Sequence, residues 1–262
     1  MRFVDEYNPQ GSTLRKQQLR MLEILLYIDN VCKENNIKYW LSSGTLLGAV
    51  RHSGFIPWDD DLDIEMLKDD YVKFLKVFPK NDNYVLQTNS TDPKYFHNYA
   101  KVRDLHSQIN EFNQDMYYKY RGLFVDVFCL ERMPRCICKL YGKLFGLIER
   151  YGYEYGSRPI IMAVIKFLQK LALLSIPIIR PFAHIISKEL HHTYGTGFLK
   201  ERFLEDIFPL SEIQFEGFVF PAPNDSDKYL RRLYGDYLQS PDPDTIEMHV
   251  SSCLFEDNIG YK

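Results

Sequence analysis

The chain is 262 residues long and 45% of its residues are hydrophobic, which is enough to bury a large core. Its 32 basic and 35 acidic residues leave a formal net charge of −3. Such a balance provides no basic field that would attract a nucleic acid, so we expect no nucleic-acid partner and expect any anionic substrate to be held locally. The first ten residues lack the apolar run of a secretory signal, which predicts a cytoplasmic protein.

Helix and strand patterns alternate in the first part of the chain. Apolar residues at helical spacing predict an amphipathic helix over 12–35, and the alternation over 37–41 predicts a short strand that runs into a tight turn. A second helix is expected to begin around Leu46. At 62–66 apolar and acidic residues alternate with a two-residue period, which is typical of a strand with one apolar face.

Further strand patterns follow at 84–87, 99–103 and 122–130. A last strand-like run at 213–220 precedes a short helix that is capped near Ser226. This mixture predicts an α+β fold, in which a small mixed sheet is flanked by helices and accompanied by a mainly helical insertion or C-terminal half.

A mainly helical region over 134–207 separates a predicted catalytic core over 1–133 from a strand and helix over 208–262, which we expect to pack back on that core. Within the helical region, 159–187 is apolar but interrupted by lysine and arginine. A spanning helix needs about 20 predominantly apolar residues, and Pro177 is expected to break or kink a helix there. The segment is therefore either a pair of core helices or a surface in peripheral contact with the inner face of the cytoplasmic membrane, beside an acceptor.

Two carboxylates share one face of the predicted strand. Because successive strand residues point to opposite faces, Asp61 and Asp63 project side by side, about 7 Å apart. Their repulsion is on the order of 2 kcal/mol at an effective dielectric of roughly 20, and a bound cation would offset it. Oxygen ligands favour Mg²⁺ or Mn²⁺. The alternative is a solvated acidic face, whereas the spacing does not fit an EF-hand calcium loop. Asp59 and Asp60 are expected to shape the turn or to support the site indirectly.

A Gly-Thr turn precedes these acids, between a predicted strand and a predicted helix. Backbone N–H groups at a helix start can bind an anion, and Gly44 would let a phosphate approach closely. Thr45 belongs to the same turn, and Arg51 could add a charge-assisted contact to the same phosphate. Most such turns are only turns, so it is the position ahead of the paired acids that indicates a diphosphate site.

A third acid, Asp126, lies inside the otherwise apolar run GLFVDVF at 122–128. A buried unpaired charge is costly, so this carboxylate needs a metal, a cationic partner or a proton. We expect the strand that bears Asp61 and Asp63 to lie beside it and to share a metal with it. Judged alone, Asp126 could instead cap a backbone group or pair with an arginine.

Residues 41–64, LSSGTLLGAVRHSGFIPWDDDLDI, resemble the signature of the LicD family. AKVRD at 100–104, the strand that contains Asp126, and YGDY at 234–237 follow in the family's order. The resemblance implies a nucleotidyltransferase-like fold, with a Gly-Ser/Thr turn, an Asp-x-Asp strand and a third acid on a neighbouring strand. It covers most of the chain outside 134–207.

In characterised members of this family, phosphocholine moves from CDP-choline to a sugar hydroxyl of a surface glycan and CMP is released, whereas relatives such as fukutin transfer a phosphoribitol unit. The resemblance therefore implies a donor that is CDP-choline or another CDP-alcohol, and an acceptor that is a glycan or a lipid-linked glycan, such as lipopolysaccharide or teichoic acid. A nucleotide-sugar glycosyltransferase is the alternative enzyme, but no G-x-G-x-x-G motif or P-loop precedes the acids. A catalytically silent carbohydrate-binding protein is the third interpretation.

The resemblance also assigns roles to single residues. Asp61 and Asp63 would hold one or two magnesium ions on the diphosphate, and Asp126 would complete the metal site and accept the proton of the attacking hydroxyl. The candidates for binding the donor are Gly44, Thr45, Arg51, Trp58, Lys101 and Arg103. Lys101 and Arg103 are equally well explained as a charged strand face, and Trp58 is the aromatic residue that we suspect of binding choline.

Overall fold

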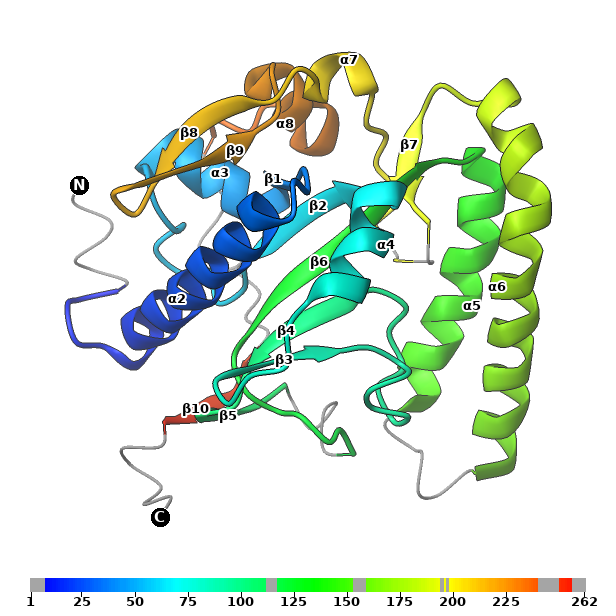
Figure 1. Ribbon diagram of the computed structural model, residues 1–262, viewed down its shortest axis with the longest axis horizontal. Coiled ribbons are helices and arrows are strands. Elements are labelled where there is room, and N and C mark those ends of the chain that lie inside the picture. The colour runs from blue at the N-terminus through cyan, green and yellow to red at the C-terminus, as the bar shows by residue number, and fades with distance from the viewer. Residues whose placement is uncertain are drawn as a thin grey trace.

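A mixed β-sheet forms the centre of the fold (Figure 1). The computed structural model describes residues 8–111, 117–152, 159–193, 196, 198–239 and 250–255. Within them the strands of the central sheet lie in the order β1 (Trp40–Leu41), β2 (Asp63–Leu67), β6 (Phe124–Arg132), β4 (Ala100–Asp104) and β3 (Tyr84–Gln87), and β7 (Leu190–His192) pairs with the end of β6. This sheet and its flanking helices confirm the predicted α+β fold.

Strand β6 has three neighbours in the sheet. It runs parallel to β2, with Asp126 opposite Asp63, and antiparallel to β4, with Asp126 opposite Lys101. Its last three residues pair with β7. All residues of β6 except Arg132 are buried, which agrees with the nearly continuous apolar sequence of a strand that is covered on both faces. This strand therefore brings three charged side chains together.

Two helices, α2 (Thr13–Glu34) and α4 (Lys68–Val77), cover one face of the sheet and lie in front of it in Figure 1. Helix α2 begins as predicted, because Ser12 Oγ accepts a hydrogen bond from the backbone N–H of Arg15 at 3.0 Å and caps the helix. Ile64 and Met66 of β2 are fully buried in the core that these helices cover. The acidic residues that alternate with them are therefore directed to the opposite face.

The predicted helical region contains the hairpin of α5 (Arg135–Gly152) and α6 (Pro159–Ile186), at the right of Figure 1. Pro177 does not end the second helix, which continues through it. A proline removes one helical hydrogen bond and kinks a helix without ending it where packing holds both sides. Here Ile176 and Ala183 pack in one cluster with Cys138 and Tyr141 of α5. This region also contributes β7, which is too short to show a strand pattern in the sequence.

The C-terminal run at 213–220 is a hairpin, and the prediction of a single strand was wrong. Strands β8 (Ser211–Phe215) and β9 (Phe218–Ala222) flank a two-residue turn. Both turn residues have positive φ, 52° at Glu216 and 82° at Gly217, which is the geometry that two-residue hairpin turns require.

Other boundaries differ less from the predictions. The predicted strand at 37–41 is reduced to the two residues of β1, and the next helix begins three residues before Leu46. The C-terminal helix is capped by Asp225, one residue before the predicted Ser226, because Asp225 Oδ1 accepts from the backbone N–H of Lys228 at 2.9 Å. The remaining elements are α3 (Ser43–His52), β5 (Ser107–Asn110), α7 (Leu204–Ile207), α8 (Ser226–Tyr234) and β10 (Ser252–Phe255).

Candidate active site

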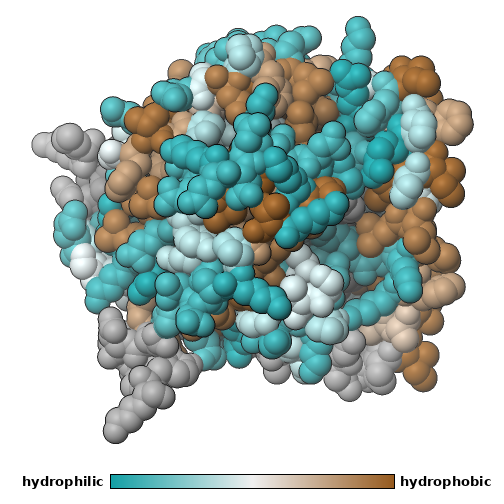
Figure 2. All heavy atoms as spheres, in the orientation of Figure 1, coloured by the Kyte–Doolittle hydropathy of each residue, from teal (hydrophilic) through white to brown (hydrophobic). Residues whose placement is uncertain are grey.

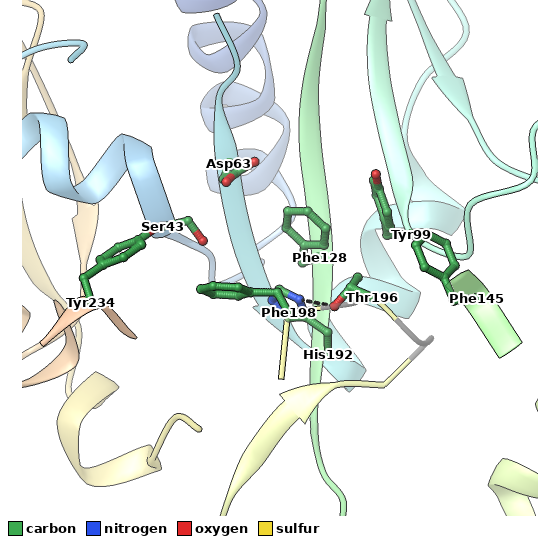
Figure 3. A pocket seen from close by; sticks show the side chains of 9 residues that line it. All are labelled: Ser43, Asp63, Tyr99, Phe128, Phe145, His192, Thr196, Phe198 and Tyr234. Carbon is green, nitrogen blue, oxygen red and sulfur yellow. Dashed lines mark hydrogen bonds between the residues drawn. The ribbon is translucent and has the colours of Figure 1, made fainter. Parts of the chain in front are cut away.

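A cavity of about 270 Å³ opens on the face of the sheet that α2 and α4 do not cover. It is lined by Ser43, Asp63, Tyr99, Phe128, Phe145, His192, Thr196, Phe198 and Tyr234. Figure 3 shows Ser43 and Asp63 on one side, Phe128 in the middle, and Tyr99 with Phe145 on the other side. The cavity therefore combines residues of the predicted core with residues of the helical region and of α8.

Two of the predicted acids are direct neighbours across β2 and β6. Asp63 and Asp126 are register partners, and the backbone N–H of Asp126 donates to the carbonyl oxygen of Leu62 at 2.8 Å. Asp61 precedes β2, so the strand alternation that placed it beside Asp63 does not extend to it. Its negative charge nevertheless raises the pKa of both Asp63 and Asp126, which indicates that the three acids lie near one another.

The acids make the site strongly electronegative. Burial, followed by the charges of Asp61, Asp126 and Asp59, raises the pKa of Asp63 well above its usual range. Burial also raises the pKa of Asp126 to about 6, although Lys101 acts in the opposite direction. Asp60 is separate from this group, because it is buried and its Oδ2 accepts from the backbone N–H of Val250 at 2.8 Å. Asp59 therefore belongs to the site more closely than the sequence indicates.

The acid cluster fits a divalent cation by charge and by ligand type. Among the described residues, no three His, Cys, Asp or Glu side chains are arranged to enclose a metal ion. Magnesium, however, commonly binds through one or two carboxylates together with substrate phosphates and water. The mutual repulsion that raises the pKa of Asp63 is what such a cation would relieve. Asp61, Asp63 and Asp126 are therefore suited to an ion that arrives with a phosphate-bearing substrate.

Lys101 is paired with two acids, one of which is Asp126. Its Nζ is 3.1 Å from Oδ1 of Asp126 and 3.4 Å from Oε1 of Glu111, and it lies over the ring of Phe124. Only 3% of this residue is exposed. Lys101 thus places a positive charge beside Asp126.

The turn at 43–45 is fixed directly against Asp63. Thr45 Oγ1 accepts a hydrogen bond from the backbone N–H of Asp63 at 2.8 Å, and the N–H of Ser42 donates to the carbonyl oxygen of Asp63 at 3.1 Å. A side chain at Gly44 would approach Oδ2 of Asp59 to 2.9 Å, so it would displace the Asp59 carboxylate. The N-terminus of α3 therefore meets the acid cluster, with Ser43 rather than Thr45 facing the cavity.

None of the six candidate donor-binding residues lines the cavity, although Thr45 and Lys101 contact Asp63 and Asp126. Arg51 lies in the last turn of α3, about 12 Å along the helix axis from its start. Arg103 is fully buried, where it donates to Gln87 Oε1 and to the carbonyl oxygen of Gly122 at 2.8 Å, and pairs with Glu111 at 2.9 Å. Trp58 is not among the lining residues. The structure thus gives Arg103 other partners and places Arg51 away from the start of α3, and the role predicted for Trp58 stays a prediction.

A buried network next to the cavity escaped the sequence analysis. Glu65 is fully buried and accepts hydrogen bonds from Tyr229 at 2.6 Å and from Trp40 at 3.1 Å. Its Oε1 lies 2.6 Å from the guanidinium of Arg202 and 2.8 Å from Nε2 of His192. Although burial alone would raise it, these partners, above all Arg202, hold the pKa of Glu65 at about 2.

The signal for Glu65 was present in the sequence, because it follows Asp63 by two residues on the same face of β2. His192 carries this network to the cavity wall. Its other ring nitrogen is 2.9 Å from Thr196 Oγ1, and the ring stacks on Phe128 with centroids 4.5 Å apart. Burial and the neighbouring Arg202 lower the pKa of His192 to about 4, so the imidazole is neutral near pH 7.

Comparison with known proteins agrees with the resemblance to the LicD family. Residues 36–138 match the family model for the nucleotidyltransferase domain of LicD, FKTN and FKRP. Over 261 residues the chain is 29% identical to the lipopolysaccharide cholinephosphotransferase LicD of Haemophilus influenzae, and the match covers 90% of this chain and 96% of that protein.

Two other relatives match shorter parts of the chain. An uncharacterised protein of Rickettsia typhi, RT0683, is 32% identical over 114 residues, which are 40% of this chain and 37% of that protein. The ribitol 5-phosphate transferase FKRP of Homo sapiens is 42% identical over 48 residues, which are 18% of this chain and 10% of that protein. The turn, Asp61, Asp63 on β2 and Asp126 on β6 all lie inside the matched region, so residues 36–138, which carry the candidate site, match the nucleotidyltransferase domain of the LicD family.

Proposed function

We propose that this protein transfers phosphocholine from CDP-choline to a hydroxyl group of a cell-surface glycan and releases CMP, with Mg²⁺ or Mn²⁺ as cofactor. Its relatives are named as a cholinephosphotransferase and as ribitol-phosphate transferases, which supports the coarser statement that the chain is a transferase of phospho-alcohol groups. Choline is supported by the aromatic cavity and the cation by the acids, whereas the cytidine nucleotide rests on the resemblance to the LicD family.

The aromatic cavity is the observation that favours choline. Rings of Tyr99, Phe128, Phe145, Phe198 and Tyr234 surround a space that also touches the carboxylate of Asp63. A quaternary ammonium group has no hydrogen to donate and is attracted to aromatic faces and to negative charge. The position next to the acids would put the attached phosphate at the N-terminus of α3.

The same cavity has few polar side chains to offer to ribitol. A chain of free hydroxyl groups needs several hydrogen-bonding partners, because each buried polar group without one is costly. Of the polar side chains that line the cavity, His192 already has both ring nitrogens engaged, and Thr196 is one of its partners. Ser43, Asp63 and the hydroxyl groups of Tyr99 and Tyr234 remain, so it is the number of aromatic rings that favours the ammonium over the polyol.

In the proposed reaction, the acceptor hydroxyl oxygen forms a bond to the phosphorus that carries choline. The bond from this phosphorus to the oxygen bridging to CMP breaks, so that CMP leaves with the bonding electrons. The proton of the hydroxyl group passes to Asp126, a carboxylate that lies 3.1 Å from the ammonium of Lys101. Lys101 stabilises the ionised form of this base beforehand.

Asp61 and Asp63 would hold the cation, and Asp126 would complete its ligand set. When bound, the cation neutralises charge on the diphosphate of the donor. The backbone N–H groups at the start of α3 contribute a second positive end next to the same phosphates. The cation and the N-terminus of α3 would thus place positive charge next to the diphosphate, while the aromatic cavity would hold the choline group.

A donor panel tests this proposal. The purified protein is incubated with Mg²⁺ or Mn²⁺ and with CDP-choline, CDP-ribitol or UDP-glucose, with and without glycan acceptors, and released CMP and UDP are measured. CDP-choline is expected to be the preferred donor, with no release in EDTA. Preference for CDP-ribitol would contradict the assignment of choline alone, and release of UDP only would contradict the transfer of a phospho-alcohol.

A further inference from the structure

A continuous apolar stripe runs along the outer side of α6. Its members recur every three or four residues, which puts them on one face of the helix. They are Ile160, Val164, Phe167, Leu171, Leu174, Ile178, Phe182 and Ile185, each between 48% and 84% exposed. Figure 2 shows hydrophobic atoms along the edge of the molecule where α6 lies in Figure 1. With 28 residues the helix is about 42 Å long. The stripe is therefore a contiguous apolar patch, which differs from the isolated apolar residues found on most protein surfaces.

The opposite face of α6 is attached to the rest of the protein along its length. Lys166 Nζ donates to the carbonyl oxygen of Pro93 at 2.8 Å, Gln169 Nε2 donates to Asn98 Oδ1 at 2.6 Å, and Arg180 pairs with the buried Glu131. By length and composition Ile160–Ile186 could cross a membrane. A crossing helix would lose all three of these contacts, whereas a helix that lies flat keeps them. The stripe therefore faces away from the protein along the whole side of a helix that can lie flat on a surface.

The charge of the hairpin indicates what covers the stripe. Helices α5 and α6 together contain seven lysines and arginines and one acid, Glu149, although acids outnumber bases in the whole chain. Lys139 and Lys143 are exposed on α5 next to Leu140, which is 65% exposed, and Lys170 is exposed on α6. Apolar stripes with basic flanks are typical of helices that lie in the interface of anionic membranes. Two copies joined by this face would bring like charges together.

We propose that the α5–α6 hairpin docks the protein on the surface of an anionic lipid bilayer. The stripe enters the boundary between headgroups and acyl chains, and the lysines contact the anionic headgroups. Phe145 of α5 lines the active-site cavity, so docking holds that cavity beside the bilayer. Docking through the hairpin does not depend on which donor the enzyme uses.

Vesicle flotation of the full chain tests the stripe. Vesicles of phosphatidylcholine with phosphatidylglycerol are compared with vesicles of phosphatidylcholine alone, and the wild-type chain is expected to partition into the anionic vesicles. Phe167→Ser combined with Phe182→Ser is expected to lower the partition coefficient about tenfold or more. The matched control is Phe218→Ser with Val219→Ser, which removes two apolar side chains of 45% and 49% exposure on β9 and should leave partitioning unchanged.

A second set of variants tests the charges. Lys139→Gln, Lys143→Gln and Lys170→Gln together are expected to weaken binding to the anionic vesicles about tenfold or more and to remove its salt dependence. The proposal is overturned if the wild-type chain does not float with anionic vesicles, or if the stripe variant floats equally well. It is also overturned if sedimentation shows a dimer that only the stripe variant loses while no vesicles are bound, because the stripe would then cover a second copy.

Discussion

Asp63 and Asp126 stand opposite each other on parallel strands, and this pairing places two carboxylates side by side on the open face of the sheet. A parallel ladder holds its partners at one separation, so neither residue can turn away without disturbing the strand pairing. The cost of the arrangement appears as a raised pKa at both residues. The fold therefore holds two carboxylates that repel each other at the point where the donor phosphates are expected.

Removal of either carboxylate should separate catalysis from stability. Asp63→Asn and Asp126→Asn are each expected to reduce CMP release at least about 100-fold. In EDTA the same variants should unfold at equal or higher temperature than wild type, and their free energy of unfolding should exceed that of wild type by up to about 1–3 kcal/mol, because the repulsion has been removed. Asp82→Asn, at an exposed loop position, is the control and should change neither property. Undiminished CMP release in both site variants would refute the role of the acids.

The pKa of Asp126 also predicts how the stability of the metal-free protein depends on pH. A carboxyl group whose folded pKa of about 6 exceeds its unfolded value contributes stability that is complete below about pH 4. That contribution is lost as the pH rises through about 6. Denaturant unfolding in EDTA should therefore show a free energy of unfolding that falls over this window in wild type and falls less in Asp126→Asn. Identical pH profiles for the two proteins would contradict the raised pKa.

The parts of the site that the sequence predicts are those carried by a local pattern. The alternation at 62–66 identifies the strand of Asp63, and an acid inside an apolar run identifies Asp126, so their pairing follows once two such strands are placed together. The aromatic cavity has no comparable signal. Its rings come from positions as far apart as Tyr99, Phe145 and Tyr234, and each of them alone looks like a core residue.

Two differences between the predictions and the structure have similarly local causes. Arg51 was assigned to the diphosphate by its nearness in sequence to the turn, but a helix carries a residue away by about 1.5 Å at each step. Glu216 and Gly217 were absorbed into a strand because apolar residues continue on both sides of them, whereas their backbone forms a turn. Sequence patterns therefore predicted single elements better than they predicted which side chains meet.

Glu65 should be essential for folding rather than for chemistry. Glu65→Gln leaves the guanidinium of Arg202 buried without its carboxylate partner and is expected to lower the free energy of unfolding by about 3–5 kcal/mol. Because the pKa of Glu65 is held at about 2, its contribution to stability is present above about pH 4.5 and is lost as the pH falls toward 2. Chemical denaturation at pH 7 and at pH 3 measures both effects. The difference between variant and wild type should be smaller at the lower pH, and an equal difference would contradict the assignment.

The aromatic cavity predicts which substitutions weaken binding of the donor. Phe198→Leu and Tyr234→Leu remove two rings whose centroids lie 6.3 Å apart at the cavity, and each is expected to raise KM for CDP-choline about five- to tenfold through the loss of about 1 kcal/mol of cation–π attraction. Trp58→Leu removes an aromatic ring outside the lining and should leave KM unchanged. A larger effect at Trp58 than at the two cavity residues would favour the prediction from the sequence that Trp58 binds choline.

Lys101 and Arg51 provide a matched pair of cations for the last prediction. Lys101 is the group that lowers the pKa of Asp126, so Lys101→Met should raise that pKa further and shift the rising limb of the pH–activity profile to higher pH. At pH 7 more of the base is then protonated, and kcat should fall about tenfold or more. Arg51→Met removes a charge of the same sign from the far end of α3 and should leave the limb in place. If both variants lowered kcat without moving the limb, Lys101 would act on the substrate and not through Asp126.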